Sequence, residues 1–464
     1  MKQEIGLIGM GVMGTSLSRN LARNGFAVSL YNRHVEGSEE AVAQKAQMQY
    51  EELASALVFD ALSPFVASLS HPRKIILMVN AGAAVDAVLN ELLPQLDAGD
   101  VIVDGGNSHY SDTQKRIASC AQSGIHFLGA GISGGEKGAL HGPAIMPSGS
   151  TAGYALMQPY LEKIAAMNRD GHPCCSYIGP QGSGHFVKMV HNGVEYVEMQ
   201  LIAECYALLK QQGCANDAIA DYFTQWLPEC QSYLLSISIK ILQKKEGDHY
   251  LLDRILDQAA NKGTGRWSAQ AIADFGEAAT LIPAALWARY LSYFKKYREQ
   301  AAAFFQTNPL QSTLAIDQLK AAYQWARVVN HHQGFSLIQH VSNTHEWNVH
   351  LPTIARLWTA GCIIQSDLMY TLSSDLATHQ HLLLHPRWKD FFERHHTAAK
   401  AVAKAAIDAE VHLPCLLEAL NFFHGYKTVH SSANLIQAQR DFFGAHTYQR
   451  TDDSSGESHH TLWE

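Results

Sequence analysis

The chain has 464 residues, of which 47% are apolar and 17% are charged, the balance of an ordinary soluble protein. A chain of this length is expected to form two or three domains with most of its apolar surface buried. Its formal net charge of −8 argues against a general binder of nucleic acid or membranes, and no stretch is apolar for long enough to cross a bilayer.

Short β-branched runs alternate with helical segments over residues 1–180. This alternation predicts a Rossmann-like, doubly wound parallel sheet, the fold of a dinucleotide-binding domain. A glycine-rich stretch at 176–184 (SYIGPQGSG) predicts a hinge into the second domain. The strand candidates are 5–8, 28–31, 75–79, 101–104 and 126–128.

Residues 181–440 carry long helical segments and almost no strand signal, which predicts a large all-helical domain. The fold class is therefore α/β plus all-α. Residues 441–464 are polar, and we expect this C-terminal tail to lie on another subunit, because it would not pack alone.

The first predicted strand runs into a GxGxxG turn, and a helix is predicted from Thr15. Glycines at these positions permit a tight turn and close approach of a pyrophosphate to the helix N-terminus. The pattern alone is weak evidence, but its place between a strand and a helix strengthens it. The turn comprises Gly9, Met10, Gly11, Val12, Met13 and Gly14.

The second predicted strand ends at Asn32, Arg33 and His34. Enzymes that use NAD usually place a carboxylate there for the ribose hydroxyls, whereas a guanidinium pairs with a 2′-phosphate. We therefore predict NADP as the cofactor. Glu36 would weaken this preference if it reached back to Arg33.

Two further loops follow predicted strands at the edge where ligands bind in this architecture. One is Asp104–Ser108 (DGGNS), and the other contains Ser133, Gly134 and Gly135. Paired glycines expose backbone N–H groups that can hold oxygen atoms, although two ordinary turns would have the same composition.

A row of polar side chains follows one face of the helix predicted over residues 184–200. Lys188, Asn192 and Glu195 are spaced four and three residues apart and span about 10 Å, a length that suits a small sugar acid. They offer a base, a hydrogen-bonding amide and an acid in a fixed order. The competing interpretation is a solvated polar stripe.

The surroundings of the row favour function. The apolar residues of this segment fall on the other side, and glycines around the row suggest close approach to the backbone. The apolar set is Phe186, Val190, Val194, Val197 and Leu201, and the glycines are Gly182, Gly184 and Gly193.

The cysteines and the paired histidines predict no metal site. The eight cysteines lack zinc-site spacing, which indicates reduced thiols in a cytoplasmic protein. Adjacent histidines on a helix point in different directions, so we expect the pairs 331–332, 395–396 and 459–460 to be surface residues.

Together these motifs resemble the 6-phosphogluconate dehydrogenase family over nearly the whole chain. The segments that carry the resemblance are GMGVMG, NR, DGGNS, ISGGEKGA…GPAIMPSG, GHFVKMVHNGVEY, DQAANKGTGRW and LIQAQRDFFGAHTY. The helix motif and the C-terminal motif are specific to this family, whereas the GxGxxG turn is shared with many dehydrogenases. The resemblance implies NADP-dependent oxidative decarboxylation of 6-phosphogluconate to ribulose 5-phosphate by a homodimer.

The resemblance also implies roles for individual residues. Lys188 would be the general base and Glu195 the acid that protonates the enediol. The cofactor would meet Val79, Asn80, Ala81 and Asn107 besides the turn and Asn32–His34. The substrate would meet Asn107, Ser133, Gly134, Gly135, His191, Asn192, Tyr196, Lys262 and Arg289, with Arg440 and His446 supplied by the partner subunit.

The sequence departs from the family at a few positions. Asn80 stands where lysine is usual, which puts cofactor selectivity in question, and His34 replaces a common threonine. Thr359 and Gln365 replace arginines, which bears on stability or assembly. Two alternatives are a β-hydroxyacid dehydrogenase for an unphosphorylated acid and a non-catalytic NADP-binding regulator. The KGTG loop and the tail argue against the first, and intact Lys188 and Glu195 argue against the second.

Overall fold

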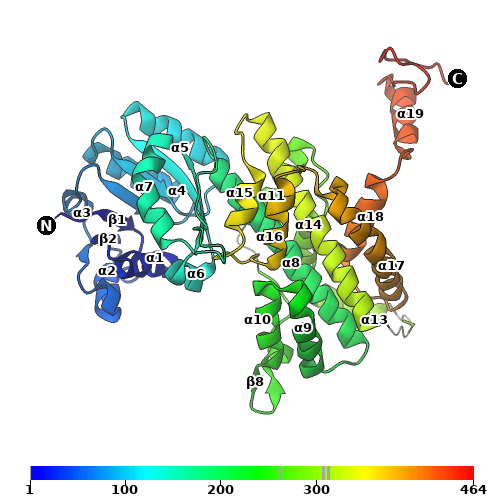
Figure 1. Ribbon diagram of the computed structural model, residues 1–464, viewed down its shortest axis with the longest axis horizontal. Coiled ribbons are helices and arrows are strands. Elements are labelled where there is room, and N and C mark those ends of the chain that lie inside the picture. Colours follow the sequence, from blue (N-terminus) through cyan, green and yellow to red (C-terminus); the bar gives the residue numbers. More distant parts are fainter. Residues whose placement is uncertain (1, 261–262, 306–308, 311–313) are drawn as a thin grey trace.

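The computed structural model describes residues 2–260, 263–305, 309–310 and 314–464. An N-terminal α/β domain stands beside a helical domain, and a last helix projects from the helical domain with the C-terminus (Figure 1). Among the described residues, no helix combines the length and the hydropathy needed to cross a bilayer.

The N-terminal domain is built on a seven-stranded sheet of order β3-β2-β1-β4-β5-β6-β7. Every neighbouring pair is parallel except β6 and β7, which are antiparallel. The order reverses between β1 and β4, the point at which a doubly wound sheet opens a ligand crevice. The strands are β1 Ile5–Ile8, β2 Val28–Tyr31, β3 Leu57–Phe59, β4 Lys74–Leu77, β5 Val101–Asp104, β6 His126–Ser133 and β7 Ala144–Gly149.

The predicted Rossmann-like class is confirmed, with two corrections. Two strands were not predicted: β3, a three-residue edge strand, and β7, whose sequence AIMPSG contains a proline and lacks β-branched alternation. Because β7 runs antiparallel to β6, the sheet is mostly rather than wholly parallel. These two omissions do not change the predicted ligand-binding edge, because that edge is formed by β1, β2, β4 and β5.

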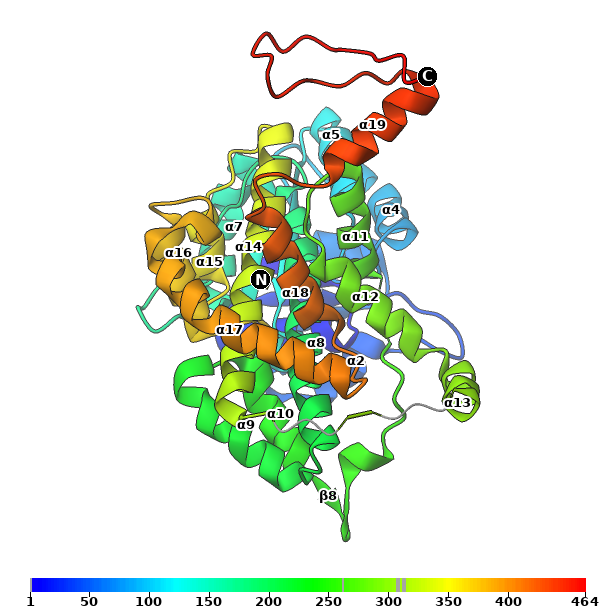
Figure 2. The ribbon, with the colours of Figure 1, turned by 90° about the vertical axis from the view of Figure 1, so that its right-hand side faces the viewer.

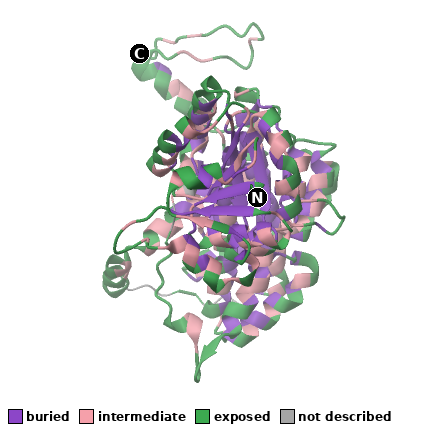
Figure 3. Cartoon of the chain, turned by 90° about the vertical axis from the view of Figure 1, so that its left-hand side faces the viewer, coloured by how far each residue is buried: buried purple, intermediate pink, exposed green. Residues whose placement is uncertain are grey.

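Helices cover both faces of the sheet, and strand residues alternate between two apolar cores. Ile5 and Leu7 of β1 point into the core under α1, whereas Ile8 points into the core under α3 and α4. Figure 3 shows the sheet as a buried layer between helices that are exposed on their outer sides. The helices of this domain are α1 Val12–Arg23, α2 Val42–Gln49, α3 Leu62–Ala67, α4 Ala83–Leu92, α5 Tyr110–Gln122, α6 Gly135–His141 and α7 Thr151–Ile164, with 3-10 turns η1 Glu51–Leu53 and η2 Leu93–Gln95.

The helical domain is organised around two long helices, α8 and α14, which pack against each other. Its only described strands form the small antiparallel hairpin of β8 Lys245–Glu246 and β9 His249–Tyr250. The first helices are α8 Ser183–Gln211, α9 Asn216–Cys230, α10 Tyr233–Gln243, α11 Thr264–Phe275, α12 Leu281–Ser292 and α13 Lys295–Phe304, with η3 Leu251–Arg254. They are followed by α14 Ile316–Thr344, α15 Leu351–Leu357, α16 Asp367–Leu376, η4 Leu382–Leu384, α17 Pro386–Asp408, α18 Pro414–Tyr426 and α19 Ala433–Gly444.

The apolar side of α8 is buried as its period predicts, with Phe186, Val190 and Val194 wholly inaccessible to solvent. The expectation for one histidine pair is wrong, because His331 and His332 of α14 are both buried. Neighbouring helices surround α14, so it has no solvated face along this stretch. The two rings do point apart: His331 Nδ1 bonds to the carbonyl oxygen of Arg327 at 2.8 Å, whereas His332 packs against Phe422.

The N-terminal half of α8 lies directly on β6 and β7, and glycines permit this contact. A Cβ on Gly184 would come within 2.1 Å of the carbonyl oxygen of Met146, and one on Gly131 within 2.3 Å of Lys188 Cβ. Close approach near the polar row was predicted from Gly182, Gly184 and Gly193. The approaching groups are parts of the chain itself, at Tyr110, Met146 and Ile282.

Candidate active site

The glycine-rich turn after β1 has the geometry of a phosphate-binding turn. Gly9 has φ +98°, and a Cβ there would meet the carbonyl oxygen of Met78 at 2.5 Å. Gly14 lies against the carbonyl oxygen of Gly9, whereas no atom of the described residues is within 4 Å of the position of a Cβ on Gly11. Gly11 is the N-cap of α1, which begins at Val12 rather than at Thr15. The open side of the turn therefore faces the helix N-terminus, where an anion is stabilised.

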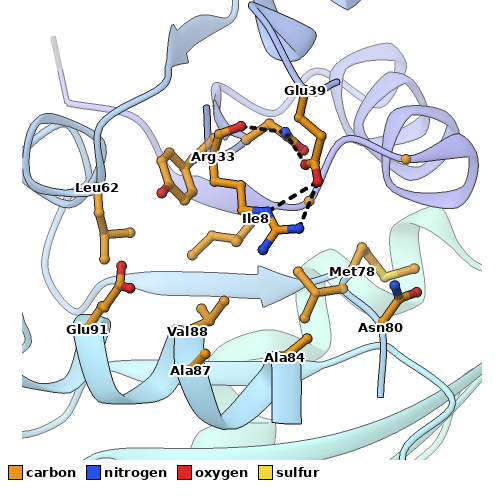
Figure 4. A pocket seen from close by; sticks show the side chains of 15 residues that line it. Ile8, Arg33, Glu39, Leu62, Met78, Asn80, Ala84, Ala87, Val88 and Glu91 are labelled. Atoms are coloured by element: carbon orange, nitrogen blue, oxygen red, sulfur yellow. Dashed lines mark hydrogen bonds and ion pairs between the residues drawn. The ribbon is translucent and has the colours of Figure 1, made fainter. Parts of the chain in front are cut away.

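A cavity of about 300 Å³ opens beside this turn, between the ends of β1, β2 and β4 (Figure 4). Gly9, Gly11, Asn32, Arg33, Val79 and Asn80, all predicted to meet the cofactor, are among the residues that line it. Apolar side chains of α4, including Ala84, Ala87 and Val88, form the opposite wall. An apolar slot beside a phosphate-binding turn suits the adenosine part of a dinucleotide.

Other predicted cofactor residues lie outside the lining of this cavity. His34 is exposed beyond Arg33, and Ala81 is exposed in the turn before α4. Met10 and Val12 line a separate cavity of about 410 Å³ on the α2 side of the turn, and Met13 packs against the core beneath. The structure therefore groups Asn32, Arg33, Val79 and Asn80 around one cavity, but not His34 or Ala81.

The guanidinium of Arg33 already forms an ion pair with a carboxylate. Arg33 donates to Glu39 Oε1 from Nη2 at 2.8 Å and from Nε at 3.2 Å. Asn32 donates from Nδ2 to the other oxygen, Glu39 Oε2, at 3.0 Å, and its own Oδ1 accepts from the backbone N–H of Met10 at 2.9 Å. The Arg33 guanidinium lowers the pKa of Glu39. The acidic residue that meets Arg33 is thus Glu39 and not Glu36, which is exposed.

The polar row of α8 is buried rather than solvated, so the competing interpretation as a surface stripe is wrong. Lys188 is 6% exposed and Asn192 is 9% exposed. Lys188 Nζ donates to Asn192 Oδ1 at 2.8 Å and lies 3.3 Å from His191 Nδ1. Glu195, one turn further along, has a side chain 19% exposed and lies 3.8 Å from His191 Nδ1. The row therefore points its base, amide and carboxyl groups to one place.

Burial changes the acid–base character of this row. Desolvation lowers the pKa of Lys188, while the negative charge of Glu195 partly opposes that shift. Burial and the neighbouring Lys188 hold the pKa of His191 well below its usual range, so the ring is neutral at pH 7. A lysine of lowered pKa has more of its amine in the uncharged form, which can accept a proton.

Asn107 stands beside the row, at the end of the DGGNS loop. It lines a small cavity of about 10 Å³ together with Lys188, Asn192 and Trp267. The loop is held from below by Asp104, which accepts from Ser108 Oγ at 2.6 Å and from the N–H of Gly106 at 3.0 Å. Asn107 is therefore placed next to the proposed base, on a loop that follows the sheet edge.

The Ser133–Gly135 loop reaches the same place from β6. Ser133 Oγ lies 3.3 Å from His191 Nε2, which connects the loop to the row. Gly134 has φ +123° and packs against the carbonyl oxygen of Gly361, and Gly135 has φ +62° with open space at its Cβ position. Both glycines thus hold conformations that other residues rarely adopt.

Tyr196 of α8 and Arg289 of α12 extend the site beyond the polar row. The Arg289 guanidinium lies 3.5 Å from the centre of the Tyr196 ring, and burial lowers its pKa. Lys262 lies outside the described residues. Of the two cations predicted to bind the phosphate in this part of the site, the described residues therefore include Arg289.

Arg440 and His446 lie away from the row in the described chain. They belong to α19 and the segment after it, which project from the helical domain (Figure 2). Arg440 is exposed and donates to Gln437 Oε1 at 2.9 Å, and the His446 ring packs on Phe443. The fold of a single chain does not bring these two residues to Lys188.

Comparison with known proteins identifies the family. Residues 4–179 match the NAD binding domain of 6-phosphogluconate dehydrogenase, and residues 184–463 match the C-terminal domain of 6-phosphogluconate dehydrogenase. The chain belongs to the 6-phosphogluconate dehydrogenase family.

Relatives within the 6-phosphogluconate dehydrogenase family match over their full length. The chain is 41% identical to decarboxylating 6-phosphogluconate dehydrogenases from Lactococcus lactis subsp. cremoris (96% of both chains) and Escherichia coli K12 (100% of this chain and 99% of the relative). Among solved structures, the enzyme of Plasmodium falciparum, studied in apo form and in complexes with its cofactor NADP+ and its substrate 6-phosphogluconate, superimposes with a TM-score of 0.94. It is 34% identical, and the match covers 99% of this chain and all of that one.

Three departures from the family pattern have identifiable places. Asn80 is on the wall of the 300 Å³ cavity, so it puts an uncharged amide there. Thr359 is buried and donates to the carbonyl oxygen of Arg356 at 2.7 Å, and Gln365 Oε1 accepts from the N–H of Gly361 at 2.8 Å. Both hydrogen bonds lie in or next to the segment of Gly361, whose carbonyl oxygen lies against Gly134.

Some residues near the site were not predicted. His185 lines the small cavity beside Lys188, and its Nδ1 lies 2.6 Å from Thr113 Oγ1. Its position three residues before Lys188 could have indicated it, because such residues share a helix face. No sequence motif indicated Glu39. It reaches Arg33 because a turn pairs Val35 with Glu39 and returns the chain to the end of β2.

Proposed function

We propose that this chain catalyses the oxidative decarboxylation of 6-phosphogluconate to ribulose 5-phosphate and CO₂, with reduction of NADP, a step of the pentose phosphate pathway. The observation that carries the proposal is the buried row of α8, in which Lys188 lies 2.8 Å from Asn192 and 3.3 Å from His191. Membership of the family supports the same reaction, since full-length relatives are named for it.

In the proposed reaction, the neutral amine of Lys188 takes the proton of the 3-hydroxyl of the substrate. NADP would supply the hydride acceptor for C3, and the product of this oxidation is a β-keto acid. Loss of CO₂ leaves its electron pair on the ketone as an enediol, and protonated Lys188 donates to the developing oxygen. Glu195, one heptad from the base on the same helix face, then delivers a proton to the carbon that carried the carboxyl group.

Substrate positioning in this proposal uses the loops around the row. Asn107, Ser133 and Asn192 offer hydrogen bonds to hydroxyl and carboxylate groups, and Gly134 and Gly135 expose backbone N–H groups. Arg289 beside Tyr196 would meet the phosphate. Arg33 and Asn32 would hold the adenosine end of NADP, and the Gly9–Gly14 turn its pyrophosphate.

We also propose that the chain works as a cytoplasmic homodimer in which Arg440 and His446 of each tail complete the site of the partner. The support is the composition of α19, which exposes Leu435, Phe442 and Phe443, with Trp463 beside them. Apolar side chains of this size on a projecting helix suit burial against a second copy. The eight free thiols are consistent with a reducing compartment.

The test is NADPH formation with 6-phosphogluconate and, separately, with gluconate, combined with detection of released CO₂. The proposal expects NADPH and CO₂ in equal amounts from 6-phosphogluconate and little from gluconate. NADPH without CO₂ would contradict decarboxylation, and equal rates with gluconate would contradict a phosphorylated substrate.

A further inference from the structure

The charge of the 300 Å³ cavity is unusual for a site that receives a phosphate. Among the described residues that line it, Arg33 is the one cation, whereas Glu39 and Glu91 both carry carboxylates. The other polar groups of the lining are uncharged: the phenol of Tyr31 and the amides of Asn32 and Asn80 (Figure 4). A ligand phosphate approaching Arg33 therefore meets a carboxylate that is already bound there.

The position of Glu39 is set by the backbone as well as by its side chain. The N–H of Glu39 donates to the carbonyl oxygen of Val35 at 2.8 Å, and the N–H of Val35 donates back to Glu39 at 3.1 Å. This closed turn returns Glu39 to the end of β2. Its two carboxylate oxygens then divide between Arg33 and Asn32.

The end of the second strand is the place where dinucleotide-binding sheets recognise the adenosine ribose. A carboxylate there accepts from the 2′-hydroxyl of NAD, whereas an arginine pairs with the 2′-phosphate of NADP. This chain presents both groups in one ion pair. A 2′-phosphate must share or displace Glu39, while a 2′-hydroxyl can donate to Glu39 and leave the pair intact.

We propose that Glu39 sets the cofactor selectivity of this protein by competing with the 2′-phosphate for Arg33 and Asn32, so that NAD is accepted alongside NADP. The inference rests on the proposed dehydrogenase function and adds the residue that limits its preference. Asn80 acts in the same direction, because it contributes no positive charge that would offset Glu39.

The expected effect is moderate because the ion pair is at the surface. The Arg33 side chain is 69% exposed and that of Glu39 is 36% exposed, so solvent screens their interaction. Removing one negative charge beside a bound phosphate should change affinity by about fivefold to tenfold.

Calorimetric titration with two fragments tests the proposal without turnover: adenosine 2′,5′-bisphosphate, which carries the 2′-phosphate, and ADP, which has a 2′-hydroxyl. Glu39→Gln keeps the size and hydrogen-bonding capacity of the side chain but removes its charge. We expect it to bind the bisphosphate about fivefold to tenfold more tightly and ADP no more tightly than the unaltered protein. Glu36→Gln is the matched control, since Glu36 lies in the same turn, is exposed and does not line the cavity.

Unchanged or weaker binding of the bisphosphate by Glu39→Gln would overturn the proposal, because Glu39 would then orient Arg33 rather than oppose the phosphate. Equal tightening by Glu36→Gln would overturn it too, since the effect would be one of general charge. These outcomes are independent of the proposed reaction: the unaltered protein can reduce NADP with 6-phosphogluconate in either case, and only failure of that assay would reject the function itself.

Discussion

The buried row of α8 and the exposed tail carry two parts of the same proposed site in opposite ways. Lys188, His191 and Asn192 are held against one another by a helix that the whole domain encloses. Arg440 of α19 and His446 in the segment after it are both exposed, and that part of the chain projects away from the row. One chain therefore brings the proposed proton-transfer groups together by itself, whereas the fold of one chain leaves Arg440 and His446 away from them.

Burial accounts for the difference in chemistry. A lysine removed from water loses stabilisation of its charged form, which lowers its pKa and makes it a base. An arginine keeps its charge whether it is exposed or enclosed, so a projecting helix can carry one to a phosphate site formed elsewhere.

Lys188→Ala is expected to have the largest effect. Removing the base should lower kcat by about 10³-fold, within the usual range for general acid–base catalysis. Because Lys188 lies outside the cavity beside Arg33, the affinity for NADP should stay the same. Steady-state NADPH formation and fluorescence titration of NADP measure the two effects.

Lys210→Ala is the matched control for this change, since Lys210 is on the same helix but exposed. It should leave both kcat and NADP affinity unchanged. Normal turnover of the Lys188 variant would exclude Lys188 as the base.

Glu195→Gln is expected to lower kcat by about 10²-fold, because the amide cannot deliver the proton to the enediol. The same change has a second consequence that only an electrostatic neighbour of Lys188 would produce. The charge of Glu195 raises the pKa of Lys188 against desolvation, so its removal should move the acidic limb of the rate profile to lower pH. A profile of kcat/KM against pH checks this shift. An acidic limb that stays in place would mean that the charge of Glu195 does not act on the base.

Arg440→Ala is expected to raise the KM for 6-phosphogluconate about tenfold to thirtyfold through loss of a charge-assisted hydrogen bond, with a smaller change in kcat. If Arg440 acts across subunits, mixing this variant with Lys188→Ala should restore low-KM activity, because one site of each hybrid dimer has both groups. Mixing followed by assay at low substrate concentration measures the recovery. No recovery in a mixture shown to contain hybrids would argue that Arg440 serves its own chain.

Arg33→Ala should have the smallest effect, a rise of about fivefold to tenfold in the Kd for NADP and less for NAD. The guanidinium is exposed, and Glu39 already neutralises part of its charge. Parallel titrations with the two cofactors measure the difference. Equal losses for both would mean that the 2′-phosphate is recognised elsewhere.

Those parts of the structure that depend on neighbouring residues alone could be predicted from the sequence. The GxGxxG turn, the strands around it and the buried face of α8 follow from glycine conformations and residue period. The sequence could not show that Lys188 is enclosed, because the groups that exclude water from it come from distant segments such as β6 and Trp267. Nor could it show the return of Glu39 to Arg33, or the burial of His331 and His332, which depend on how separate elements meet.

The pH dependence of kcat/KM for 6-phosphogluconate, measured for the unaltered protein and for Lys188→Ala, tests the central claim most directly. Only the uncharged amine accepts the proton, and desolvation lowers the pKa of Lys188 below its ordinary value of 10.5. The rate of the unaltered protein should therefore rise with pH up to a limb below 10.5 and then level off, and the residual rate of the variant should lack that limb. The same limb in both proteins would contradict the account, because the titrating base would then be another group.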